Sequence, residues 1–150
     1  DSNPQSPHTV IDLGEVYAGQ AGSAMRACAL LASRIGVVQD RLTGVKPGAK
    51  VRWAMVTRAR SCKAQGNDMM LATGKKRLTV RAVLPTAVTW QVLDLSTPPN
   101  TWDSANEGAS MIAFEAVVPE SGAVDFRVML VPGGVQPGQA IPDFIATGKK

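Results

Sequence analysis

Several residue types that carry enzyme chemistry are scarce in this sequence of 150 residues. It has one histidine, His8, and one tyrosine, Tyr17, so a serine–histidine–aspartate triad would have to use a histidine near the beginning of the chain. No serine lies in a GxSxG turn, and there is neither a GxGxxG loop nor a P-loop. We therefore expect no catalytic residue within this chain.

Cysteine is also scarce, and its pattern excludes the usual metal sites. Cys28 and Cys62 form no CxxC pair and lack metal-site spacing. With one histidine and no clustered cysteines, we expect no bound metal and no cofactor. The sequence leaves open whether the two thiols form a disulfide, because it does not show whether their Cβ atoms approach each other. Cys28 lies in the apolar run ACALL, which favours a buried thiol.

Long hydrophobic runs and strong charge are missing too. No apolar run reaches the roughly 18 to 20 residues of a membrane-spanning helix, so we expect no membrane span. The start, DSNPQSPHTV, has neither an initiator methionine nor a signal-peptide pattern, and we interpret the chain as part of a larger protein. A formal net charge of +4 suits a polyanionic ligand, but a mixed soluble surface explains it more simply. Because no nucleic-acid motif is present, we expect no nucleic-acid partner.

What the sequence has in abundance is alternation of apolar and polar residues with a period of two. In KVRWAMVT, for example, Val51, Trp53 and Met55 share one strand face. Such segments predict about nine short strands, over residues 8–17, 24–31, 34–40, 50–57, 67–72, 77–85, 87–94, 110–118 and 123–132. The pattern predicts an all-β chain, residues 1–150, that folds as one antiparallel β-sandwich or paired-sheet domain. The tail, 133–150, begins with a stretch rich in proline and glycine, so we expect an extended peptide laid over a surface.

An ordered set of motifs resembles the C-terminal β-sheet region of the heparinase II/III-like polysaccharide lyases. The motifs are Asp12-Leu13 followed by Tyr17, Arg26 before an apolar strand, Asp40 at the end of a hydrophobic strand, KVRWAMVTRA with Trp53, GKKRLTVRAVLP, PPNTWDSANEG and LVPGG. Each motif is short, but together they follow the family's order over about residues 10 to 134.

The resemblance implies a function. Lyases of this family cleave acidic polysaccharides such as heparin, heparan sulfate or alginate by β-elimination at a uronic acid, in the periplasm or outside the cell. An upstream α/α toroid supplies most catalytic groups. This chain would then be the non-catalytic β domain that supports the toroid and lines the substrate cleft. Family members often carry a histidine where this sequence has Val56, so we expect no histidine or zinc role there.

Candidate binding residues follow from side-chain chemistry. The guanidinium groups of Arg52, Arg58 and Arg60 match sulfate or carboxylate groups of an acidic polysaccharide, although a solvated strand face is the simpler interpretation. Trp53 and Trp90 alternate in phase with aliphatic residues and are expected in the core. Trp102 lies outside any alternation, and it is a candidate to stack on sugar or to pack on this domain or the toroid. The alternative function is a free-standing carbohydrate-binding or structural β-sandwich module.

Overall fold

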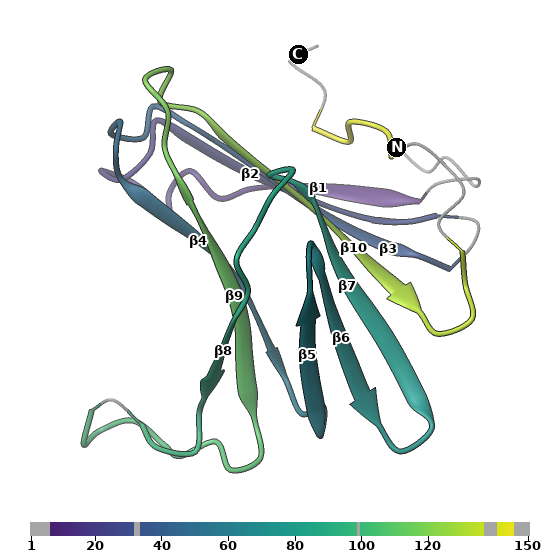
Figure 1. Ribbon diagram of the computed structural model, residues 1–150. Helices are drawn as coiled ribbons and strands as arrows, with labels where there is room; N and C mark the ends of the chain where they lie inside the picture. Colours follow the sequence, from purple (N-terminus) through teal and green to yellow (C-terminus); the bar gives the residue numbers. More distant parts are fainter. Residues whose placement is uncertain (1–6, 32–33, 99, 137–140, 146–150) are drawn as a thin grey trace.

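The computed structural model describes residues 7–31, 34–98, 100–136 and 141–145, which form ten strands in two antiparallel sheets (Figure 1). The large sheet has the order β1 (His8–Asp12), β2 (Ser23–Leu30), β3 (Gly36–Thr43), β10 (Val124–Pro132), β7 (Lys76–Leu84), β6 (Asp68–Thr73) and β5 (Ser61–Gln65). The small sheet has the order β4 (Lys50–Thr57), β9 (Ser110–Val117) and β8 (Gln91–Asp94). This confirms the predicted all-β, paired-sheet fold. Within the described ranges, no helix is long and apolar enough to cross a membrane.

The differences from the predicted strands have local causes. Strand β5 was not predicted, because this edge strand, SCKAQ, buries little and shows no clear alternation. Strand β1 ends at Asp12 rather than at residue 17, since the Asp12 carboxylate accepts a hydrogen bond from the Gly14 amide (2.8 Å) and a run of turns follows. Strand β3 begins later and runs to Thr43, and β8 begins only at Gln91.

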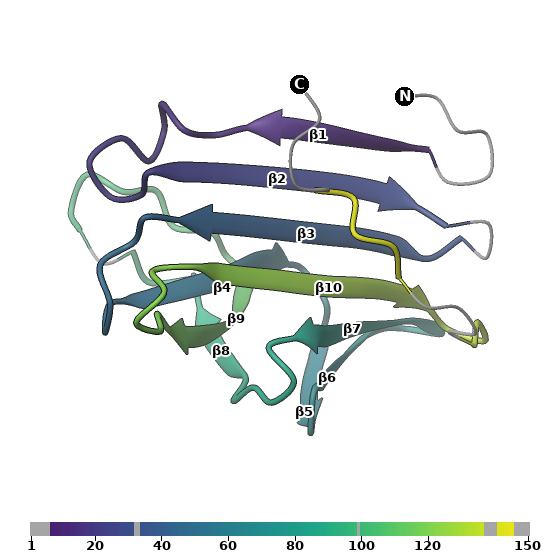
Figure 2. The ribbon, with the colours of Figure 1, turned by 90° about the horizontal axis from the view of Figure 1, so that it is seen from above.

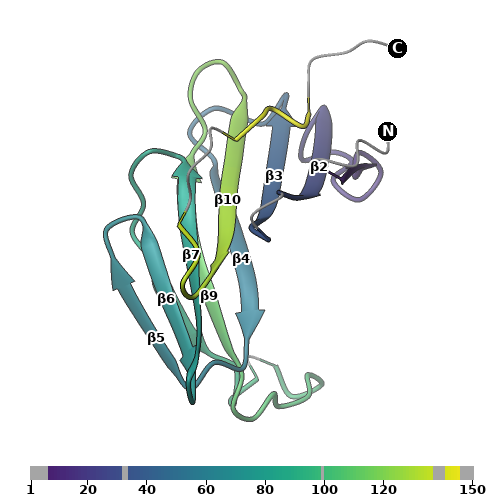
Figure 3. The ribbon, with the colours of Figure 1, turned by 90° about the vertical axis from the view of Figure 1, so that its right-hand side faces the viewer.

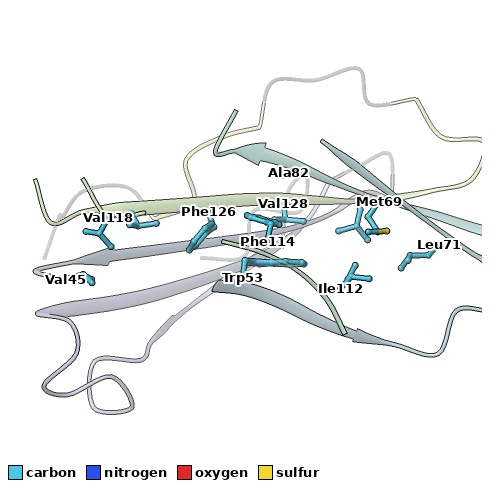
Figure 4. Packing of buried hydrophobic residues seen from close by; sticks show 12 residues of the cluster. Val45, Trp53, Met69, Leu71, Ala82, Ile112, Phe114, Val118, Phe126 and Val128 are labelled. Carbon is cyan, nitrogen blue, oxygen red and sulfur yellow. The ribbon is translucent and has the colours of Figure 1, made fainter. Parts of the chain in front are cut away.

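The main hydrophobic core lies between the two sheets (Figure 4). Trp53 on β4 stacks on Phe114 of β9, with ring centroids 5.5 Å apart. The Trp90 ring meets the Phe114 ring edge-on, with centroids 5.0 Å apart. The Phe126 ring of β10 also contacts Phe114, with centroids 5.7 Å apart. Aromatic pairs at such distances add to the stabilisation that burial provides. The predicted core positions of Trp53 and Trp90 are therefore confirmed.

The opposite face of the large sheet, which we call the outer face, has a smaller core of its own. Ile35, Val37 and Met129 are buried there, and residues of segment 141–145 pack against them. Figure 2 shows this segment, in yellow, crossing β10 and β3 on the side away from the small sheet. The predicted tail peptide thus lies on a surface over residues 141–145, while 137–140 and 146–150 lie outside the described residues.

Polar groups hold segment 141–145 in place. The buried Gln39 side chain accepts a hydrogen bond from the Phe144 amide (3.0 Å) and donates one to the Asp143 carboxylate (2.9 Å). Arg41 donates to Asp143 (2.8 Å), to Asp125 (2.6 Å) and to the Ile145 carbonyl. Gln39 and Arg41 lie two residues apart on β3, so both side chains reach the outer face.

The two cysteines are too far apart in the fold to form a disulfide. Cys28 lies on β2 and Cys62 on β5, and four strands of the large sheet separate them. Neighbouring strands are about 4.8 Å apart, and a disulfide requires Cα atoms within roughly 7 Å. Both thiols are free and half-buried. The full burial expected for Cys28 is therefore not observed.

Candidate functional site: a cleft beside strand β4

A cleft with a volume of about 430 Å³ opens where the small sheet ends and the inner face of the large sheet is left uncovered. One wall is formed by β2 and β3, and the other by the start of β4. The turn between β1 and β2 and the link from β3 to β4 contribute further lining residues. Figure 3 shows β2 and β3 next to each other, with β4 partly behind β10.

An ion pair between neighbouring strands lies in the cleft wall. Arg26 and Asp40 are opposite each other in the antiparallel register of β2 and β3. The Arg26 Nε atom donates to Asp40 Oδ1 at 2.5 Å, and Nη2 donates to Oδ2 at 3.0 Å. This hydrogen bond raises the pKa of Arg26 above its ordinary value, although partial burial opposes the shift. The Asp40 side chain is only 9% exposed whereas that of Arg26 is 42% exposed, so the guanidinium faces the opening.

The cleft collects residues that are distant in the sequence. Tyr17, Arg26, Asp40 and Trp53 all line it. Tyr17 comes from the turns after β1, Arg26 and Asp40 from β2 and β3, and Trp53 from β4. These are the residues of the first four motifs on which the family resemblance rests. Four of the seven motifs therefore meet at one place in the fold.

Further cations line the cleft at the start of β4. Lys46, Lys50 and Arg52 all contribute to its lining. Arg52 donates to the Glu115 carboxylate on β9 at 2.7 Å, and Lys50 lies 3.8 Å from the same group. The hydrogen bond from Arg52 holds the pKa of Glu115 below its ordinary value. One carboxylate thus faces two cations, and Lys46 makes no ion pair with a described residue. The cleft mouth is therefore positively charged overall.

The structure separates the four residues predicted to bind substrate. Arg52 lines the cleft. Arg58 and Arg60 follow the other end of β4, which is eight residues long and so spans about 25 Å. Arg58 donates to the Glu107 carbonyl at 3.0 Å, and both arginines are exposed. Trp102 lies in the loop between β8 and β9 and is 82% exposed, so it does not pack on its own domain.

The cleft can bind an anion, but it offers little acid–base chemistry. Tyr17 and Asp40 are titratable groups of its wall, and Asp40 is held by Arg26. Among the described residues, no group of three or more histidine, cysteine and acidic side chains could hold a metal ion. Val56 faces outward from β4 and is 57% exposed. Sequence reasoning missed Lys46 and Lys50 as cleft residues, and Arg26 was noted only as part of a motif.

Comparison with known proteins identifies the fold. No protein-family model and no curated protein matches this sequence. Among solved structures, the chain is similar to heparan sulfate lyase HepC from Pedobacter heparinus, with a TM-score of 0.65 and 11% identity over 95% of this chain. It is also similar to Heparinase III, with a TM-score of 0.58 and 13% identity over 85% of this chain. The chain spans about a fifth of the length of these lyases, 22% and 20% respectively.

These structural similarities define the class of fold. The paired-sheet domain is one that polysaccharide lyases contain as part of a longer chain. More particularly, the predicted resemblance to the heparinase II/III-like lyases is confirmed at the level of the fold.

Proposed function

We propose that this chain is a non-catalytic β domain of a lyase that cleaves an acidic polysaccharide by β-elimination at uronic acid residues. The observation that carries this proposal is the cleft in which Tyr17, Arg26, Asp40 and Trp53 meet, within a fold shared with heparan sulfate lyase HepC. The cations at the cleft mouth suit a polyanionic chain, because they concentrate anionic ligands near the opening. The substrates we propose are heparin, heparan sulfate or alginate.

In this function the domain supports the groups that do the chemistry and does not supply them. Elimination needs a base for the C5 proton, an acid for the leaving oxygen and neutralisation of the uronate charge. The cleft provides positive charge from Arg52 and Lys50, but it contains no histidine. We therefore propose that an upstream α/α toroid of the same protein supplies the acid and base. We propose the periplasm or the extracellular space as its location.

The test is an eliminase assay of the complete gene product and of this 150-residue chain. Both are incubated with heparin, heparan sulfate and alginate, and the unsaturated product is followed by its ultraviolet absorbance. We expect turnover by the complete product and none by the chain alone. No product from any of the three glycans would overturn the lyase proposal, and turnover by the chain alone would overturn its non-catalytic role.

A matched pair of variants tests the cleft itself. Lys50→Gln removes a cation from the cleft, and Arg34→Asn removes one from an exposed turn in which Arg34 has a φ of 62° that asparagine tolerates. We expect Lys50→Gln to raise KM of the complete product several-fold and Arg34→Asn to leave it unchanged. Equal effects of the two substitutions would show that the cleft does not bind the substrate.

The exposed Trp102 favours a second candidate, a free-standing carbohydrate-binding module. A tryptophan this exposed can stack on a sugar ring. Its loop, however, carries Asp103 and Glu107 and no basic residue from 95 to 109, which disfavours an acidic sugar at this point. The binding module predicts affinity of the isolated chain for neutral glycans, with loss of that affinity in Trp102→Ala. Calorimetric titration with neutral oligosaccharides distinguishes the two functions.

A further inference from the structure

A cluster of basic residues lies at the end of the molecule away from the cleft, and the cleft does not use it. From residue 58 to residue 93 the chain has seven basic residues and a single acidic one, Asp68. Asp68 is already bound by Arg81 through two hydrogen bonds of 2.7 Å. The other six basic residues, Arg58, Arg60, Lys63, Lys75, Lys76 and Arg77, make no salt bridge within the described ranges and are exposed. We call these six residues the basic end.

The fold brings the basic end together from three segments. The link after β4 carries Arg58 and Arg60, β5 carries Lys63, and the β6–β7 hairpin carries Lys75, Lys76 and Arg77. The Arg60 amide donates to the Thr73 hydroxyl at 3.4 Å, and Thr73 is opposite Lys76 across the hairpin. Figure 1 shows the β4–β5 link and the β6–β7 turn at the same lower edge of the molecule.

The hairpin turn brings Lys75, Lys76 and Arg77 together at its tip. Gly74 adopts a φ of 58°, which glycine reaches without strain and which a tight two-residue turn requires. The Arg77 guanidinium folds back to the carbonyls of Gly74 (2.5 Å) and Lys76 (3.0 Å). These neutral partners leave the charge of Arg77 uncompensated. The tip of the hairpin therefore presents uncompensated positive charge to solvent.

The chemistry of the basic end favours sulfated sugar over nucleic acid. Proteins that hold single strands of nucleic acid stack bases on aromatic side chains, and readers of duplexes place an element in a groove. From residue 54 to residue 89 this sequence has no aromatic residue. Arginine and lysine can nevertheless bind the sulfate oxygens that project from a polysaccharide, by charge and by hydrogen bonds.

We propose that the basic end is a second glycan-binding site, which holds sulfated stretches of an acidic polysaccharide beyond the end of β4 that lies away from the cleft. The proposal rests on the proposed function, because it assumes that an acidic polysaccharide is the ligand. It extends that function by naming sulfate as the group recognised here. A long sulfated chain can contact both sites at once, and two linked contacts bind more tightly than either alone.

The test measures glycan binding by this chain and not catalysis. Its outcome therefore does not depend on the outcome of the eliminase assay. Calorimetric titration uses three probes: heparin, heparin from which the sulfate groups have been removed, and double-stranded DNA of matched charge. Arg60→Gln and Lys75→Gln are combined in one variant, because both side chains are exposed and neither makes an ion pair with a described residue. Arg34→Asn controls for the loss of an exposed cation elsewhere.

We expect the double variant to bind heparin about five- to tenfold more weakly at low salt, because two exposed charge contacts are lost. Its affinity for desulfated heparin should change by less than about twofold. Unchanged heparin affinity would overturn the proposal, and so would DNA that competes as well as heparin. If the eliminase assay fails but the sulfate-dependent loss is observed, the proposed function is wrong and the second site stands.

Discussion

Arg26 and Asp40 are directly opposite each other on β2 and β3 and form a two-point ion pair at 2.5 and 3.0 Å. The carboxylate is nearly buried, while the guanidinium reaches the cleft. One pair thus joins two neighbouring strands of the large sheet and forms part of the wall of the candidate site. A substitution of Arg26 therefore alters both the pairing of these two strands and the wall of the candidate site.

Arg26→Ala should destabilise the fold, because it leaves the Asp40 carboxylate without its partner. Removing one partner of a fully buried pair costs about 3–5 kcal/mol, and the partial exposure of Arg26 reduces the expected loss to about 2 kcal/mol. The control is Arg81→Ala. The partner of Arg81, Asp68, is 25% exposed, so we expect this substitution to lower the free energy of unfolding by less than about 1 kcal/mol. Urea denaturation at neutral pH measures the free energy of unfolding of both variants. Equal losses would contradict the larger cost that we expect from leaving the nearly buried Asp40 carboxylate unpaired.

Phe114→Ala and Trp90→Phe should differ strongly, although the two rings touch. Phe114 is fully buried among three aromatic rings, so its loss should cost about 3–5 kcal/mol. The Trp90 Nε1 atom is buried without a hydrogen-bond partner in the described residues. Replacing Trp90 by phenylalanine removes this unsatisfied group, which offsets the lost contact area, and we expect a change within about 1 kcal/mol. Thermal denaturation of both variants checks the contrast.

The attachment of segment 141–145 should depend on pH through Asp143. Burial alone would raise the pKa of Asp143, but hydrogen bonds from Arg41 and Gln39 outweigh it, and the net pKa lies below its ordinary value. A depressed pKa in the folded state contributes stability above the unfolded pKa of about 3.9, and this contribution is lost as pH falls through the folded value.

Asp143→Asn is the corresponding variant. We expect it to be less stable than the parent by about 1 kcal/mol at neutral pH, a modest value because Asp143 is 44% exposed. The difference should stay constant down to about pH 5 and shrink below about pH 4. Urea denaturation over this range tests it, and a difference that grows on acidification would contradict the assigned ion pair.

Trp102→Ala should leave the melting temperature unchanged within about 1 °C, because the side chain is 82% exposed and contributes no core packing. A drop of several degrees in scanning calorimetry would show that Trp102 packs on its own domain after all. Trp53→Ala provides the contrast. Trp53 is only 4% exposed, so removing its side chain should lower the free energy of unfolding by about 3–5 kcal/mol.

Both thiols should be reactive without prior reduction. In the unfolded chain a thiol reagent should count two free groups. In the folded chain Cys62 should react more slowly than a solvated thiol at mildly alkaline pH, because burial raises its pKa and lowers the thiolate fraction. Cys62→Ser should remove the slow phase that belongs to this residue. A count of zero in the unfolded, unreduced chain would contradict the strand order.

Strand alternation was enough to predict the fold class and the core. Trp53 and Met55 alternate with polar neighbours, and the small sheet buries that face. The same reasoning failed for β5, because an edge strand buries too few residues to impose a pattern. It also failed at the end of β1, where the Asp12 side chain starts a run of turns that alternation does not encode.

The candidate site was less predictable, because it depends on the register between strands. Nothing in the two segments containing Arg26 and Asp40 shows that they are opposite each other, since a shift of one residue would place them on different faces. Likewise, Arg52 and Arg58 look like neighbours in the sequence, yet strand geometry places them at opposite ends of β4. The family resemblance identified Tyr17, Arg26, Asp40 and Trp53, but only the three-dimensional arrangement showed that they share one cleft.

The segment 141–145 also determines how far the chain can be shortened. The Phe144 ring lies 5.2 Å from that of His8, so both ends of the described chain meet on the outer face. A protein ending soon after Pro132 would keep every strand but would uncover the apolar side chains of Ile35, Val37 and Met129. Exposed apolar patches promote association. Such a truncated protein should therefore self-associate in light scattering while retaining its β-sheet spectrum.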